Sequence, residues 1–189
     1  MKNTKTIVGV GLMTALVVVL SIVSMNIKFG PFTITLALTP IVVGGALYGW
    51  KAGGWLGFVF GCMTLFDAAA FFAINVPLTV VLCLAKGTLC GIAAALVYKL
   101  LARFNGIVAS VAAAVAAPVV NTGVFLLGCT AFFLDTIKTW GEAAGFKNVF
   151  TYYIVGFVGT NFLVELGVAI VLISAVIRII NLAPSKAHA

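Results

Sequence analysis

Two charged side chains stand inside long apolar stretches of the sequence. Lys86 lies within residues 80–101, and Glu165 lies within residues 154–180. A charge held at the centre of a membrane costs at least ~2.5–3.5 kcal/mol, and charges at such depth mark functional sites. We expect one or both side chains to face a polar cavity and contact a ligand. The alternative is a buried ion pair between them that only neutralises itself.

Two asparagines extend this set. Asn161 and Glu165 are spaced i, i+4 and therefore share one face of a helix, while Asn121 follows Pro118 in another apolar stretch. The sequence predicts that Lys86, Asn121, Asn161 and Glu165 line one pocket about halfway across the membrane. The alternative for the asparagines is hydrogen bonding between helices.

Three further residues stand where the apolar stretches begin. Asn75 precedes the stretch that contains Lys86, while Trp140 and Tyr152 precede the one that contains Glu165. We predict that Asn75, Trp140 and Tyr152 contribute to ligand binding at the mouth of the pocket. Aromatic residues at this level also serve as anchors in the membrane interface, which is the alternative.

The composition identifies the surroundings of these residues. Of the 189 residues, 63% are apolar and 8% are charged. So few charges cannot cover a water-exposed surface, which excludes a soluble enzyme or a nucleic-acid binder. The apolar stretches are long and do not alternate, so they predict membrane-spanning helices rather than a β-barrel. At ~20–25 residues per span, residues 1–189 form a single domain of about six helices.

The fold class is therefore an all-α integral membrane protein. The expected spans cover residues 6–26, 32–49, 52–73, 78–102, 106–134 and 152–180. We interpret the first as a retained helix rather than a signal peptide, because no convincing small-residue cleavage site follows it. Pro40 is expected to kink the second span.

Charged residues outside the spans predict the orientation. With the N-terminus in the cytoplasm, the cytoplasmic side carries only basic residues: Lys2, Lys5, Lys51, Lys99, Arg103, Arg178 and Lys186. The outer side balances Lys28, Lys138 and Lys147 against Asp67, Asp135 and Glu142. Because cytoplasmic loops are enriched in Lys and Arg, both termini are predicted to be cytoplasmic.

Small residues predict close contacts between helices. Gly11 and Ala15 have the small-xxx-small spacing that lets a second helix approach, and glycines recur through the third span, at Gly53, Gly57 and Gly61 among others. Packing within the chain is the alternative to docking of a partner.

Several reactive arrangements are absent from the sequence. Its single histidine is His188, near the C-terminal end, and it has no glycine-rich phosphate-binding loop that ends in Lys-Ser/Thr. The sequence therefore predicts neither an enzyme nor a protein with a metal or a cofactor.

The order of several motifs resembles one membrane family. They are GLMTA (11–15), LTPIVVGGALYGWKAG (38–53), Lys86–Gly87 and APVVNT (117–122). Together they resemble the S component, the substrate-binding subunit of energy-coupling factor (ECF) vitamin transporters, over nearly the whole chain. Gly11 stands where the family's Ala-xxx-Ala motif has its first alanine, which keeps this surface small.

The resemblance implies a division of labour among subunits. The chain would bind a water-soluble vitamin in a pocket formed by the first loop and the outer halves of the fourth to sixth helices. The first helix, through Gly11 and Ala15, would dock on a transmembrane coupling (T) component. Two ATPase subunits would drive toppling of the S component and release of the vitamin inside. The resemblance also implies the plasma membrane of a prokaryote.

The residues favour one vitamin over others. Lys86 suits a carboxylate, and the asparagines and Glu165 suit hydroxyl and amide groups, so pantothenate is favoured. Riboflavin is next, because the chain is rich in aromatic residues. One alternative is an ion-coupled secondary transporter of a small organic solute that acts as a homo-oligomer through Glu165 or Lys86. Another is a membrane scaffold.

Overall fold

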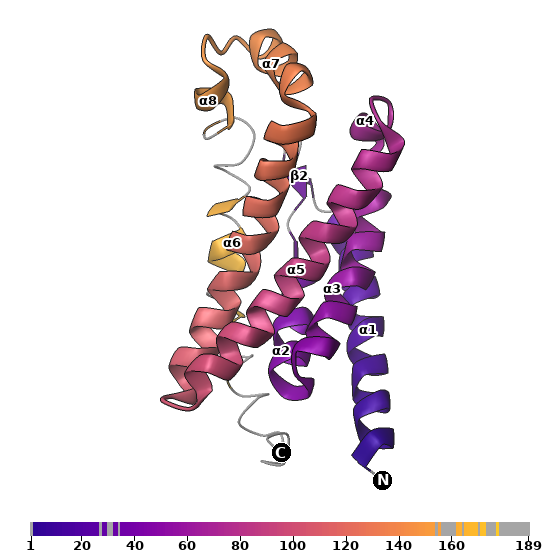
Figure 1. Cartoon of the computed structure of the whole chain (residues 1–189), viewed down its shortest axis with the longest axis vertical. Helices are drawn as coiled ribbons and strands as arrows, with labels where there is room; N and C mark the ends of the chain where they lie inside the picture. Colours follow the sequence, from indigo (N-terminus) through magenta and orange to yellow (C-terminus); the bar gives the residue numbers. More distant parts are fainter. Residues whose placement is uncertain are drawn as a thin grey trace.

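A computed structural model describes residues 2–26, 28–29, 32–33, 35–153, 155, 162–163, 165–169, 171–172 and 177. Its elements, in chain order, are α1 (Lys2–Asn26), β1 (Lys28–Phe29), β2 (Phe32–Thr33), α2 (Leu38–Tyr48), α3 (Trp50–Leu65), α4 (Ala69–Phe72), α5 (Val76–Ala102), α6 (Gly106–Phe132), α7 (Leu134–Ala143) and α8 (Val149–Thr151). Figure 1 shows α5 and α6 as a long antiparallel pair, with α2 and α3 packed against α5 and α1 packed against α2 and α3.

Among the described residues, three helices are long and apolar enough to cross a membrane: Thr4–Asn26 within α1, and the whole of α5 and α6. They confirm the predicted spans 6–26, 78–102 and 106–134 with small differences at the ends. The predicted span 152–180 lies largely outside the described residues, although residues 165–169 within it are helical.

The second predicted span is wrong at its start. Residues 32–33 pair with residues 28–29 as a short antiparallel ribbon, so the fold is not purely helical. Helix α2 begins only at Leu38, which places Pro40 in the first turn rather than in the middle. A proline there costs no helical hydrogen bond, because the first N–H groups of a helix have no partner within the helix. The expected kink is therefore absent.

The third predicted span, 52–73, is also interrupted. Helix α3 ends at Leu65, a turn follows at 66–68, and the single-turn helix α4 leads into α5. The start of α5 is fixed by Asn75, whose side chain accepts a hydrogen bond from the Leu78 N–H at 3.1 Å. Asparagine is among the residues preferred at this capping position.

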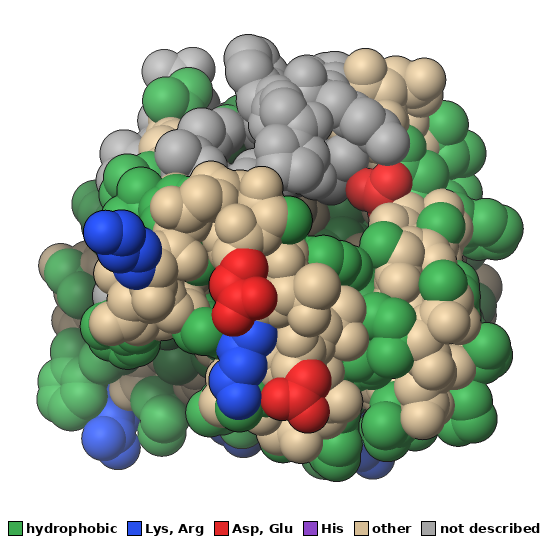
Figure 2. Space-filling model, turned by 90° about the horizontal axis from the view of Figure 1, so that it is seen from above, with side chains coloured by type: hydrophobic (Ala, Val, Ile, Leu, Met, Phe, Trp, Pro, Cys, Tyr) green, Lys and Arg blue, Asp and Glu red, His purple; other side chains and the backbone are tan. Residues whose placement is uncertain are grey.

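The two ends of the bundle differ in charge. The N-terminus of α1 and the turn between α5 and α6 lie toward one end, whereas α4 and α7 lie at the other (Figure 1). Figure 2 looks onto the molecule from above and shows acidic and basic side chains together. Helix α7 contributes an ion pair between Lys138 and Asp135 at 3.4 Å. The cytoplasmic location of the first end stays a prediction.

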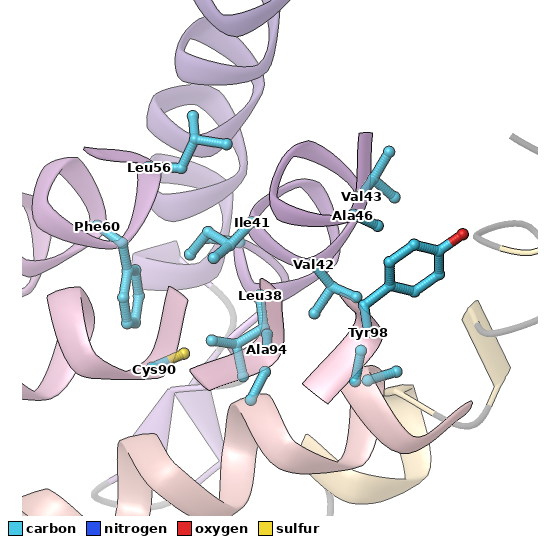
Figure 3. Packing of buried hydrophobic residues seen from close by; sticks show 14 of the residues in the cluster. Leu38, Ile41, Val42, Val43, Ala46, Leu56, Phe60, Cys90, Ala94 and Tyr98 are labelled. Carbon is cyan, nitrogen blue, oxygen red and sulfur yellow. The ribbon is translucent and has the colours of Figure 1, made fainter. Parts of the chain in front are cut away.

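The core is built around α2. Figure 3 shows side chains from α2, among them Leu38 and Ile41, lying between those of α3 and α5. Ile41 is fully buried, as are Leu56 of α3 and Cys90 of α5. Helix α6 contributes small residues to the same cluster, Ala109, Ala113, Ala114 and Ala117.

Helices α3 and α5 touch backbone to backbone along a seam of small residues. A Cβ added at Gly57 would collide with the carbonyl group of Gly87, and one added at Gly61 would lie 2.7 Å from the carbonyl oxygen of Cys83. A Cβ at Gly87 would lie 2.8 Å from the Gly61 nitrogen. The glycines of the third span thus pack within the chain, which was the alternative to partner docking.

Enlarging a glycine of this seam should destabilise the bundle. Gly87→Ala is expected to lower the free energy of unfolding by ~1–3 kcal/mol or more, because the methyl group has only backbone to displace. Gly123→Ala in α6 is the matched control, since a Cβ there meets nothing within 4 Å. The thermal unfolding midpoint of each purified variant measures the effect. Equal unfolding midpoints for the two variants would contradict the close backbone contact between α3 and α5.

Candidate ligand-binding site

A narrow cavity lies inside the bundle beside Glu165. Its lining residues come from the first loop, α2, α6 and the helical stretch 165–169: Thr35, Leu38, Thr39, Val42, Ala114, Glu165, Val168 and Ala169. Its interior has room for about one water molecule. The cavity combines one carboxylate and two hydroxyls with apolar walls, which is the composition of a polar site held in an apolar environment.

Glu165 is bound by the first loop. Its side chain is 3% exposed, and the hydroxyl of Thr35 donates a hydrogen bond to its Oε1. A hydrogen-bond donor stabilises the ionised carboxylate, which is otherwise costly to bury. The sequence identified Glu165 but missed Thr35, because residues 32–37 were assigned to a helix.

The contact lies deep in the bundle. Helix α2 has 11 residues and rises about 16 Å from the turn at Gly49, roughly half of the ~30 Å hydrocarbon core. Thr35 and Leu36, which precede it, are therefore near mid-depth with a non-helical backbone. Irregular backbone is tolerated at membrane depth only where it is buried in protein or lines a cavity. The loop geometry thus marks an interior site.

Lys86 is half-buried on α5 and faces α6. Its Nζ lies 4.8 Å from the centroid of the Phe125 ring, a cation–π contact. Within the described part of the chain Lys86 forms no ion pair, so the expected alternative of a Lys86–Glu165 bridge is not what the structure shows.

Asn121 is buried on α6, one helical turn from Phe125. Its side chain is 6% exposed, and its Oδ1 accepts no hydrogen bond from any residue that the structure describes. Leaving a buried acceptor unsatisfied costs ~1–3 kcal/mol. The alternative of hydrogen bonding between helices is therefore not observed for this oxygen within the described chain. An acceptor in this state suits a ligand that brings a donor.

A cluster of aromatic rings adjoins the Phe125 ring that Lys86 contacts. Phe71 of α4 makes edge contacts with three rings, with centroids 5.7 Å from Phe125, 5.2 Å from Phe133 and 5.4 Å from Trp140. The predicted residue Trp140 therefore packs in this cluster. No pattern in the sequence indicates Phe71, since its contacts depend on how α4 and α7 meet.

The remaining predicted site residues differ in position. Asn75 is exposed and caps α5, so its observed role is structural. The Tyr152 ring lies tilted against the Phe146 ring, with ring centroids 5.4 Å apart, beside the α7 end of the bundle. Asn161 lies outside the described residues. Lys86 and Asn121 thus lie on the neighbouring helices α5 and α6, neither of them lines the cavity beside Glu165, and Asn75 is exposed at the start of α5.

The predicted docking residues lie on the outer face of α1. Gly11 and Ala15 are both exposed, and a Cβ at Gly11 would meet nothing within 4 Å. Large apolar neighbours on this face are exposed as well, among them Leu12 and Val19. This face is free to contact lipid or another membrane helix.

Several helices of membrane-spanning length around buried polar side chains are typical of a multi-pass membrane protein. A family model described as "ECF transporter, substrate-specific component" matches residues 5–177, and the chain belongs to this family. A search of curated proteins and a search of solved structures find no match. The chain is thus the binding subunit of an ECF importer of a prokaryotic plasma membrane, not an enzyme, and such subunits work with a T component and ATPases.

The Thr35–Glu165 contact can be tested by substitution. Thr35→Val keeps the shape of the side chain but removes the donor, so it should lower the free energy of unfolding by ~1–3 kcal/mol. Thr35→Ser restores a hydroxyl and should remain near the wild type. Thermal unfolding in detergent compares the three proteins. A valine variant as stable as the wild type would show that the Thr35–Glu165 contact contributes nothing to the free energy of unfolding.

Proposed function

We propose that this S component imports a water-soluble vitamin that carries a carboxylate, with pantothenate as the favoured substrate. Two observations support the proposal: Lys86 is a half-buried cation on α5, and the buried Oδ1 of Asn121 on the neighbouring helix α6 accepts no hydrogen bond from the described residues. A ligand with an anionic end and a donor-bearing end complements both groups.

Lys86 supplies the charge. A carboxylate beside its ammonium group forms a charge-assisted hydrogen bond, which is stronger than a neutral one. The Phe125 ring contacts the same ammonium group through a cation–π interaction. This arrangement favours ligands with a carboxylate over neutral analogues of the same shape.

Asn121 supplies a hydrogen-bond acceptor for the end of the ligand that carries the donors. Pantothenate has an amide N–H and two hydroxyl groups, each of which can donate to the Asn121 Oδ1. Thr39 adds a hydroxyl in the deeper cavity beside Glu165. Riboflavin, the second candidate, has hydroxyl donors and a flat ring for the aromatic cluster around Phe71, but no carboxylate for Lys86.

We also propose that the outer face of α1 binds the T component, through Gly11 and Ala15. Small side chains let two helices approach closely without a hydrophobic driving force, which is weak between helices in lipid. The exposure of both residues supports this role. ATP hydrolysis in the ATPase subunits would then topple the S component and release the vitamin to the cytoplasm.

The substrate is tested by a cycle of two ligands and two proteins. Pantothenate should bind the wild type about 10- to 100-fold more tightly than panthenol, its alcohol analogue, because a hydrogen bond to a charged group contributes ~1.5–3 kcal/mol. Lys86→Met should remove that preference. Lys99→Met, at the exposed end of α5, is the matched control and should keep it. Calorimetry gives the affinities.

Two results would contradict the substrate assignment. Equal binding of pantothenate and panthenol by the wild type would remove Lys86 from substrate recognition. Stabilisation by riboflavin without any effect of pantothenate would move the assignment to the flavin.

Docking is tested by enlarging the small residues. Gly11→Leu and Ala15→Leu should each abolish co-purification with the T component and ATPases, because the added side chain holds the two helices apart. Vitamin binding by the isolated chain should be unchanged. Ala131→Leu, at an exposed position of α6, is the matched control. An intact complex with both α1 variants would place the docking surface elsewhere.

A further inference from the structure

Two adjacent residues of the first loop are bonded to two different parts of the protein. The Thr35 hydroxyl donates to Glu165, and the Leu36 N–H donates to the Ser24 hydroxyl of α1 at 3.1 Å. Residues 35–36 therefore connect the interior cavity to α1 through one peptide unit. Neither contact was expected from the sequence.

Ser24 is a well-defined attachment point. Its side chain is 6% exposed, and its hydroxyl donates to the Leu20 carbonyl at 2.7 Å while it accepts from Leu36. The Leu36 N–H needs this partner, because it precedes α2 and lies at mid-depth, where water does not satisfy backbone groups. Breaking the contact leaves a buried donor unpaired, so the loop and α1 are expected to move together.

Helix α1 carries the loop and the docking surface on different faces. Val17, Ser21 and Ser24 are buried and face the bundle, whereas Gly11 and Ala15 are exposed. A shift of the loop therefore acts on the inner face of the helix whose outer face is proposed to meet the T component. A rigid helix transmits such a shift along its length.

We propose that Thr35 and Leu36 couple occupancy of the cavity at Glu165 to the position of α1. A ligand group that takes over the Thr35–Glu165 hydrogen bond releases residue 35 and thereby moves the Leu36–Ser24 contact. Ser24 is in this scheme a positioning residue that acts through Leu36 and does not touch the ligand. The coupling to transport rests on the proposed function, whereas the link itself is a property of the chain alone.

The link is tested first without a ligand, by hydrogen exchange of the full chain in detergent. Ser24→Ala should speed exchange about 2- to 10-fold in residues 165–172, across the loop from the substituted side chain. Ser21→Ala, three residues away on the same buried face of α1, is the matched control and should leave 165–172 unchanged. Ser24→Thr keeps the hydroxyl and should behave as the wild type. Faster exchange confined to α1 in Ser24→Ala would overturn the link.

The second measurement uses pantothenate and the T component with its ATPases. The ratio of affinities for that complex with and without pantothenate measures the coupling between the two sites, which is commonly about 5- to 150-fold. Ser24→Ala should bring this ratio to within about twofold of one while pantothenate affinity of the isolated chain stays the same. Ser21→Ala and Ser24→Thr should keep the wild-type ratio.

The two measurements separate two kinds of failure. A wild type that ignores pantothenate contradicts the proposed substrate, yet the exchange experiment still decides the link. A Ser24→Ala protein with the full wild-type ratio overturns the coupling even where pantothenate binds.

Discussion

The backbone contact between α3 and α5 constrains the rest of the structure. Only glycine lets the two helices approach this closely, because a Cβ at Gly57 or Gly87 would occupy the space of the opposite backbone. The contact fixes the rotation of α5 about its axis. Since neighbouring residues of a helix differ by about 100° in direction, Gly87 facing α3 turns Lys86 away from it and toward Phe125 of α6. The position of the cation thus depends on residues that have no side chain.

The short length of α2 is the second constraint, and it creates the interior site. A helix of 11 residues cannot cross the membrane, so the chain before Leu38 must enter the bundle without helical hydrogen bonds. Its polar groups are satisfied by side chains instead, with Ser24 accepting from Leu36 and Glu165 accepting from Thr35. Burying the Glu165 carboxylate in lipid would cost free energy, and so would burying the non-helical backbone of the first loop. In the folded chain the loop supplies the hydrogen bond that stabilises the carboxylate.

The sequence predicted what depends on length and apolar character, and it missed what depends on tertiary contact. The spans of α1, α5 and α6 follow from their apolar runs, and the interior positions of Lys86, Asn121 and Glu165 follow from polar residues within such runs. The start of α2 does not, because the apolar residues 32–37 have the same composition in a helix, a strand or a buried loop. Asn75 illustrates another limit, since a capping residue and a ligand-binding residue at a helix start look alike in sequence.

Helix α1 has two faces of different character. Its inner face is polar where it meets the loop at Ser24, and its outer face is apolar and lined with small residues at Gly11 and Ala15. Lipid contacts alone do not require small residues on that face, because lipid chains adapt to side chains of any size. Small residues gain free energy there only when a second helix packs against them. The same helix therefore touches the loop that binds Glu165 and presents a surface suited to a partner, which is the arrangement that communication between cavity and partner requires.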